Sequence, residues 1–232
     1  MMKSILSLLL ISMTLLGDTS KALELFKKKD YEEAFKLYEK SAKAGETTAQ
    51  NALSYLYFNG VGVIKDIKKG VSWLEKAASG SDARAQNDLG MMYLIGQNVE
   101  QDSKMALTWL TKASVKNSSA LYNLALMYYR GDGADQNVTK AAELLEKSAL
   151  QGNEQAEKNI GLVYMQLLKF DKAAKWLEKN AARGEENAYY LLAEIYCENE
   201  KFGKAKKWAQ KSIDSGNKEA ELLWLKYNLE KF

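Results

Sequence analysis

The chain has 232 residues, of which 47% are hydrophobic and 27% charged, which is the composition of an ordinary globular protein. It lacks histidine, the commonest general base and metal ligand, and its single cysteine, Cys197, excludes an internal disulfide bond and a cysteine-based zinc site. The net charge of +3, with both signs mixed along the chain, gives no indication of a nucleic-acid-binding protein.

Residues 1–17 have the pattern of a secretory signal peptide. Lys3 provides a basic start, and the apolar run at residues 5–16 is 12 residues long, too short to span a membrane comfortably. Cleavage after Gly17 is favoured over cleavage after Ala22, and no cysteine follows the run to carry a lipid. We expect a periplasmic or secreted protein with no stable membrane span after cleavage. The alternative is that this run forms a buried first helix of the fold.

Two apolar patterns alternate along the rest of the chain. One has a small residue three positions before each of six anchors, which are Leu37, Trp73, Trp109, Leu144, Trp176 and Trp208. The other has a large apolar residue four positions after each of six alanines, which are Ala49, Ala85, Ala120, Ala156, Ala188 and Ala220. Both recur every 32 to 36 residues. Because steps of three and four follow one face of a helix, each pattern predicts a helix. We name the alanine-led helices A and the anchor-bearing helices B.

Capping residues predict where the B helices begin and end. Asp66, Asp102 and Asn137 stand where the N-cap of a B helix belongs. The B helices are expected to end near residues that can adopt the left-handed conformation, which are Gly45, Gly80, Asn117, Gly152, Gly184 and Gly216. Charged residues on the B helices are predicted to form a solvated face, and they are Glu75, Lys76, Glu146, Lys147, Glu178 and Lys179.

The predicted fold is all-α, a right-handed solenoid of two-helix repeats. One partial repeat, 18–45, precedes five full repeats, which are 46–81, 82–117, 118–152, 153–184 and 185–216. A C-terminal capping helix, 217–232, is expected to cover the apolar end of the stack.

These motifs resemble the Sel1-like repeat family, a branch of the tetratricopeptide superfamily. The resemblance rests on Ala85 to Tyr93 with Leu89-Gly90, on the glycine-rich turn 60–63 with Asp66, and on Trp73 through Ala78. It covers about residues 22–216, although the last two repeats are shorter and lack the glycine turn. The resemblance implies a scaffold that binds a protein or peptide.

A secreted, cysteine-rich subfamily, to which β-lactamase activity is ascribed, joins the two helices of each repeat with a cysteine pair. The resemblance places those pairs at Ala42 and Gln50, Ala78 and Gln86, Ala149 and Glu157, and Ala181 and Tyr189. None is cysteine in this chain, so the disulfide framework of that subfamily is missing.

A binding groove is expected on the A helices, by analogy with the tetratricopeptide pattern. Its positions lie two before, two after and five after the central large apolar residue of each A helix. They are Asn51, Tyr55, Phe58, Asn87, Met91, Leu94, Tyr122, Leu126, Tyr129, Lys158, Leu162, Met165, Tyr190 and Glu194, and Cys197 occupies the last such position. Tyrosine and methionine suit adaptable interfaces, and asparagine can bond an extended peptide backbone. The alternative is that the apolar members pack between repeats.

Two other functions stay open. A hydrolase of cell-wall or β-lactam amides is suggested by the cysteine-rich subfamily, and Ser215 with Lys218 matches the Ser-x-x-Lys nucleophile motif, but no Lys-Thr-Gly or Ser-Asp-Asn partner motif exists. An immunity-type protein that binds a toxin is the other. Cys197 is either a reactive thiol or a small buried residue. No metal and no cofactor is expected, and the favoured function is binding of a protein or peptide.

Overall fold

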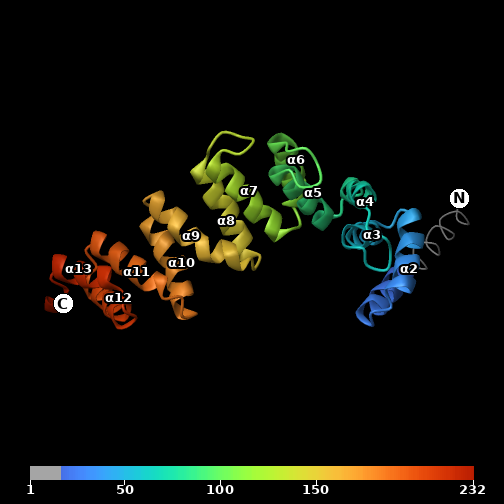
Figure 1. Cartoon of the computed structure of the whole chain (residues 1–232). Coiled ribbons are helices and arrows are strands. Elements are labelled where there is room, and N and C mark those ends of the chain that lie inside the picture. Colours follow the sequence, from blue (N-terminus) through green and yellow to red (C-terminus); the bar gives the residue numbers. More distant parts are fainter. Residues whose placement is uncertain (1–16) are drawn as a thin grey trace, which may run out of the picture. The chain divides into compact units, whose positions relative to one another are not determined.

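The computed structural model describes residues 17–232, in which every regular element is helical (Figure 1). Residues 17–27 form a helix. The elements that follow are α2 (Tyr31–Lys43), α3 (Thr47–Asn59), α4 (Ile67–Ser79), α5 (Ala83–Ile95), α6 (Ser103–Ala113), α7 (Ser118–Arg130), α8 (Val138–Leu150), α9 (Glu154–Gln166), α10 (Phe170–Ala182), α11 (Asn187–Glu198), α12 (Phe202–Asp214), α13 (Lys218–Lys226) and the 3-10 turn η1 (Leu229–Lys231). The expected signal peptide, apart from Gly17, lies outside the described residues.

The chain divides into two compact units. Unit 1 reaches from the first described residues to Leu124 and includes residues 132–134, and unit 2 consists of residues 125–131 and 135–232. Within unit 1, each helix from α2 to α5 packs against the next one along the chain, and within unit 2 the same holds from α8 to α12. The prediction of an all-α fold built from successive helix pairs is confirmed. The A helices are α3, α5, α7, α9, α11 and α13.

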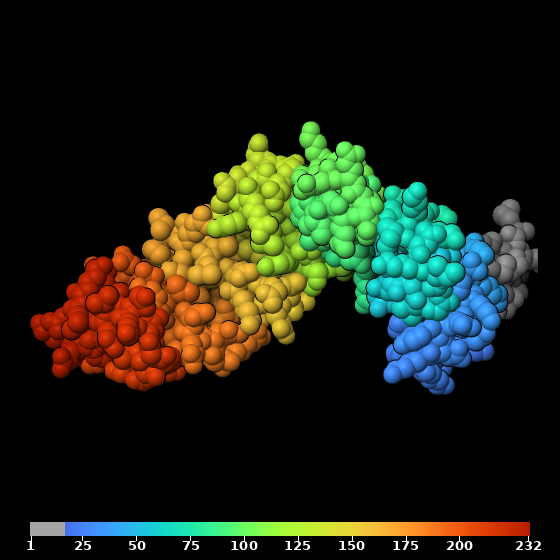
Figure 2. All heavy atoms as spheres, viewed as in Figure 1, coloured from blue at the N-terminus to red at the C-terminus, as the bar shows by residue number. Residues whose placement is uncertain are grey.

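Small residues let the helices of each pair approach closely. The six residues that lie three positions before the B-helix anchors are all buried, and they are Ala34, Gly70, Ala106, Ala141, Ala173 and Ala205. At Gly70, an added β-carbon would lie 2.6 Å from Cδ1 of Phe58. The ring of Phe58 therefore occupies the space that the alanine methyl groups fill in the other repeats. Figure 2 shows side chains filling the spaces between successive helices within unit 2.

The predicted N-caps of the B helices are confirmed. The side chain of Asp66 accepts a hydrogen bond from the backbone N–H of Lys69 at 3.0 Å, and Asp102 accepts from two N–H groups at the start of α6. Asn137 accepts from the N–H of Lys140 at 2.9 Å. Each bond satisfies a donor that the first turn of a helix leaves unpaired.

Two of the six predicted left-handed C-terminal residues were wrong. Gly80 has φ −76°, and the left-handed residue after α4 is Ser81, with φ 69°. Gly80 is needed for space instead, because a β-carbon there would lie 2.3 Å from Cγ2 of Thr47. Asn117 caps the next helix by accepting from the N–H of Ala120. The remaining four glycines do have positive φ, and they are Gly45, Gly152, Gly184 and Gly216.

The C-terminal segment differs in detail from the predicted capping helix. The helix α13 ends at Lys226, and Asn228, with φ 51°, separates it from η1. Leu229 is fully buried, and Phe232 stacks on Phe202 with the ring centroids 4.7 Å apart. The segment therefore packs back on α12 through the short turn η1 after α13.

Candidate functional site

Unit 1 contains an open groove of about 1140 Å³, which we call the polar groove. Its walls come from residues 19–23, from α3 and α5, and from the start of α7. Three predicted groove residues line it, namely Asn51, Tyr55 and Asn87. The side chain of Tyr55 is largely in contact with solvent, with 53% of its surface exposed.

Other lining residues were not predicted, although they repeat. Thr48, Arg84 and Ser119 each stand five positions before the central leucine of their A helix, and Ala52 and Asp88 stand one before it. Position five before the leucine shares an A-helix face with the positions two and one before it, because residues separated by three or four positions are neighbours on a helix surface. The recurrence of these two positions in successive repeats could have identified them, but the tetratricopeptide analogy includes only the positions two before, two after and five after the central residue.

A network of amides and carboxylates crosses the polar groove. Nδ2 of Asn123 donates to Oδ1 of Asn87 at 3.0 Å, and Nδ2 of Asn87 donates to Oδ1 of Asp88 at 3.1 Å. Nδ2 of Asn51 donates to Oδ1 of Asp82 at 3.2 Å, and the same carboxylate caps α5. These bonds orient the asparagine side chains and use one amide donor of each.

The remaining predicted residues of unit 1 lie elsewhere. Phe58 packs against Gly70 and the buried cluster of α4 and α5. Met91, Leu94 and Tyr122 are half-buried and do not line the polar groove. In repeat 46–81, the position five after the central leucine is therefore a packing position.

The predicted residues of unit 2 have mixed surroundings. The hydroxyl of Tyr129 donates to Oε1 of Gln166 at 3.0 Å, and Nζ of Lys158 pairs with Glu185 at 2.6 Å. Leu162 is exposed. Leu126, Met165, Tyr190 and Glu194 are half-buried. Burial, together with the charges of Glu194 and Glu219, raises the pKa of Tyr190.

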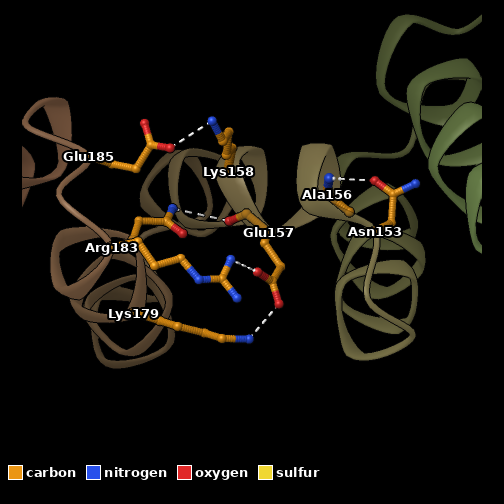
Figure 3. A network of polar contacts seen from close by, with 8 residues as sticks. Asn153, Ala156, Glu157, Lys158, Lys179, Arg183 and Glu185 are labelled. Atoms are coloured by element: carbon orange, nitrogen blue, oxygen red, sulfur yellow. Dashed lines mark hydrogen bonds and ion pairs between the residues drawn. The ribbon is translucent and has the colours of Figure 1, made fainter.

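A buried carboxylate joins α9 to α10 in unit 2 (Figure 3). Glu157, with 4% of its surface exposed, accepts hydrogen bonds from Lys179 and Arg183, and its backbone carbonyl accepts from Asn180 at 3.2 Å. Burial alone would raise the pKa of Glu157, but the hydrogen bonds and charges of the two cations outweigh it and hold the pKa below its usual value. The network satisfies a charge that would otherwise be costly to bury.

The predicted solvated face of the B helices is only partly solvated. Glu146 accepts from the hydroxyl of Tyr164 at 2.7 Å, and Glu178 accepts from that of Tyr196 at 2.6 Å. Lys179 bonds the buried Glu157. These three side chains therefore connect neighbouring helices, which a solvated face would not do.

Cys197 is buried, with 2% of its surface exposed, and it is a free thiol. Its burial raises its pKa to about 11, which keeps the thiol protonated near neutral pH. Both properties are typical of a structural cysteine rather than a reactive one. The described residues contain no group of three or more acidic or cysteine side chains placed to hold a metal ion.

The Sel1 repeat model matches the chain six times, at residues 13–46, 47–82, 83–114, 118–153, 164–185 and 187–217. The chain belongs to the Sel1 repeat family. Among curated proteins no significant match exists. No helix among residues 17–232 has the length and apolar character needed to cross a bilayer.

Solved structures of Sel1 repeat proteins share this fold. A protective antigen of uropathogenic Escherichia coli strains, with an SLR fold, is 26% identical at a TM-score of 0.75, and the match covers 91% of this chain but only 49% of the antigen. A Sel1 repeat protein from Oxalobacter formigenes is 27% identical at a TM-score of 0.68, and the match covers 87% of this chain and 88% of that one. The chain thus spans about half the length of the antigen.

This Sel1 repeat protein has hydrogen bonds at two of the positions where the cysteine-rich subfamily has disulfides. Nε2 of Gln50 donates to the carbonyl of Ala42 at 3.1 Å, and Nε2 of Gln86 donates to that of Ala78 at 2.9 Å. Both glutamines are buried. Each bond ties the start of an A helix to the end of the preceding B helix, as a disulfide between these positions would.

The Ser-x-x-Lys motif of this Sel1 repeat protein lies at a helix end. Ser215 is the exposed C-cap residue of α12, and its hydroxyl donates to the carbonyl of Lys211 at 3.0 Å. Asn217 caps the next helix. Ser215 therefore lies in a surface turn, where its hydroxyl proton is engaged by the carbonyl of Lys211.

Proposed function

We propose that this Sel1 repeat protein binds an extended segment of another polypeptide in the polar groove of unit 1. The observation that carries the proposal is the pair of oriented asparagines that line the groove on two successive A helices, Asn51 and Asn87, the second of which accepts a hydrogen bond from Asn123 of the next A helix. A primary amide both donates and accepts, and it therefore complements the alternating N–H and C=O groups of an extended backbone.

The size and lining of the polar groove support a polypeptide over a small molecule. Its volume of about 1140 Å³ lies above the range of roughly 300–1,000 Å³ that is typical of small-molecule sites. Asparagines, serines, threonines and charged residues are among the residues that line this groove, and they offer the donors and acceptors that a polypeptide backbone requires. Tyr55 adds an exposed aromatic ring of the kind that is enriched at protein interfaces.

We also propose export to the periplasm or the medium, with cleavage after Gly17. The support is the basic start and the short apolar run of residues 1–17. Cleavage there retains Ala22, which is fully buried, and Asp18, whose carboxylate pairs with Lys40 at 2.8 Å. Cleavage after Ala22 would remove both contacts from unit 1.

The test is capture of a partner from a periplasmic extract by the mature protein, followed by an affinity measurement with the captured partner. We expect the double variant Asn51→Ala, Asn87→Ala to weaken binding about 10- to 100-fold, because two hydrogen-bonding side chains are lost at about 1 kcal/mol or more each. Mass spectrometry of the N-terminus of this protein, expressed from its full-length sequence and recovered from the periplasm, reports the cleavage site.

The matched control is Ser72→Ala, Thr108→Ala, which removes two exposed polar side chains from the B helices of the same unit. Its affinity should equal that of the unmodified protein. The groove proposal is wrong if the asparagine variant and the control recover the same partner with the same affinity.

A further inference from the structure

The outer face of unit 2 carries a regular array of lysines, which we call the lysine grid. It occupies three equivalent positions on the B helices α8, α10 and α12. The nine positions are held by Lys140, Glu143 and Lys147, by Lys172, Lys175 and Lys179, and by Lys204, Lys207 and Lys211. Eight of the nine are lysine, and all nine side chains are exposed.

Helix geometry places each set of three on one face. Within a helix the positions are separated by three and four residues, so they lie on one side and span about 10 Å along the axis. Contacts in unit 2 bring neighbouring B helices together. Tyr164 of α9 bonds both Glu146 of α8 and Lys172 of α10. The hydroxyl of Tyr196 on α11 donates a hydrogen bond to Glu178 of α10, and the ring centroid of Tyr196 lies 5.0 Å from Nζ of Lys204 on α12.

The net charge of the chain is only +3, but positive charge is concentrated on the B helices of unit 2. The helices α8, α10 and α12 contain nine lysines and five carboxylates, whereas the A helices α9, α11 and α13 contain six glutamates and three lysines. Three of the carboxylates near the grid, on Glu146, Glu157 and Glu178, accept hydrogen bonds inside unit 2, and those of Glu146 and Glu157 pair with the grid lysines Lys172 and Lys179. The basic excess therefore faces outward on the B side.

Aromatic rings hold many of these lysines in place. Nζ of Lys140 lies 4.0 Å from the ring centroid of Tyr128, and Nζ of Lys211 lies 4.8 Å from that of Trp208. A lysine over a ring keeps its charge while its stem covers apolar surface. Because the rings lie beneath the lysines, they are not open platforms for stacked bases, as a single-stranded nucleic-acid site requires.

We propose that the lysine grid docks unit 2 electrostatically on a bilayer surface rich in anionic phospholipids. Lysine is depleted at protein–protein interfaces, where arginine is enriched for bidentate carboxylate contacts, and the grid contains no arginine. Clusters of four to eight basic side chains are instead typical of attraction to anionic headgroups. The proposal does not depend on the polar groove, which belongs to unit 1.

The test is co-sedimentation of the full-length protein with vesicles. We expect binding to phosphatidylcholine vesicles that contain about 30% phosphatidylglycerol at low ionic strength. We expect no binding to pure phosphatidylcholine, and loss of binding at about 0.5 M salt, where screening shortens the range of the interaction to a few ångströms. The variant Lys175→Gln, Lys207→Gln should bind about 25-fold more weakly, since each lysine near such a surface contributes about fivefold.

The matched control is Lys68→Gln, Lys104→Gln, which makes the same change in net charge on exposed B-helix positions of unit 1. It should bind nearly as well as the unmodified protein, and circular dichroism should show all three proteins equally helical. Equal weakening by both variants would mean that net charge alone acts, and absence of binding at low salt would remove the proposal. Binding to poly-glutamate or to an oligonucleotide that is tighter than binding to the vesicles, at an equal concentration of negative charge and at low salt, would overturn it in favour of a macromolecular partner.

Discussion

The buried carboxylate of Glu157 on α9 accepts hydrogen bonds from Lys179 of α10 and from Arg183, which follows α10, and it thereby joins the two helices. Its folded-state pKa is held below the usual value, so the stability it contributes is fully present above the unfolded-state pKa of about 4.3 and is lost as pH falls through the folded-state pKa. We expect Glu157→Gln to lower the free energy of unfolding by about 2 kcal/mol at pH 7, because hydrogen bonds to a charged acceptor are lost. Urea denaturation of both proteins at pH 7 and at pH values below 4 measures this, and the difference should shrink in acid.

The neighbouring ion pair supplies the control. Lys158 and Glu185 are both about half exposed, so Lys158→Gln should cost less than about 1 kcal/mol and show little pH dependence. A difference between Glu157→Gln and the unmodified protein that stays constant from pH 7 to below pH 4 would contradict the assignment of the charge.

Sequence periodicity identified the buried alanines and the N-caps, because these depend on spacing and on local backbone geometry. It did not identify the role of Glu157, which depends on two cations from the next helix. It also misplaced the left-handed residue after α4. Ser81 lies 36 residues after Gly45, so the repeat spacing contained the answer, but the conformational preference of Gly80 was given more weight.

At the scale of the helix pair, a bulky residue of α3 takes the space beside the small residue of α4. Phe58 faces Gly70, whereas the equivalent residues of the next repeat are Leu94 and Ala106. We expect Gly70→Ala to destabilise the protein by about 1–2 kcal/mol, because its β-carbon would lie 2.6 Å from the ring of Phe58, and this overpacking outweighs the better helix propensity of alanine.

The double variant Phe58→Leu, Gly70→Ala copies the pair of the next repeat and should recover most of that loss, as measured by thermal and urea denaturation. Gly203→Ala is the control, since its β-carbon would meet no atom within 4 Å and should stabilise α12 slightly. If Gly70→Ala proves as stabilising as Gly203→Ala, the close approach of α3 and α4 is not as tight as described.

At the scale of the whole molecule, the order and pairing of the helices followed from the repeat, whereas the location of the polar groove did not. Periodicity predicts which side chains share a helix face, and the tetratricopeptide analogy grouped Asn51, Tyr55 and Asn87, which all line the polar groove. It cannot predict which shared face stays open, because that depends on side-chain volume between helices. Phe58 packs into the buried cluster of α4 and α5 and does not line the groove. Arg84 and Asp88 line the groove beside Asn87 but were not predicted.

The contacts of this chain run mainly between successive helices. A substitution should therefore destabilise its own helix and the adjacent helices more than distant ones. We expect Glu157→Gln to speed amide hydrogen exchange in α9 and α10 by up to about thirty-fold, the equivalent of about 2 kcal/mol, and to leave α3 and α4 unchanged. Gly70→Ala should produce the reverse pattern. Mass-spectrometric exchange at neutral pH resolves the two regions. Equal acceleration in both regions by either variant would show that the two units unfold as one cooperative body, and neighbour-by-neighbour stability would then be wrong for this protein.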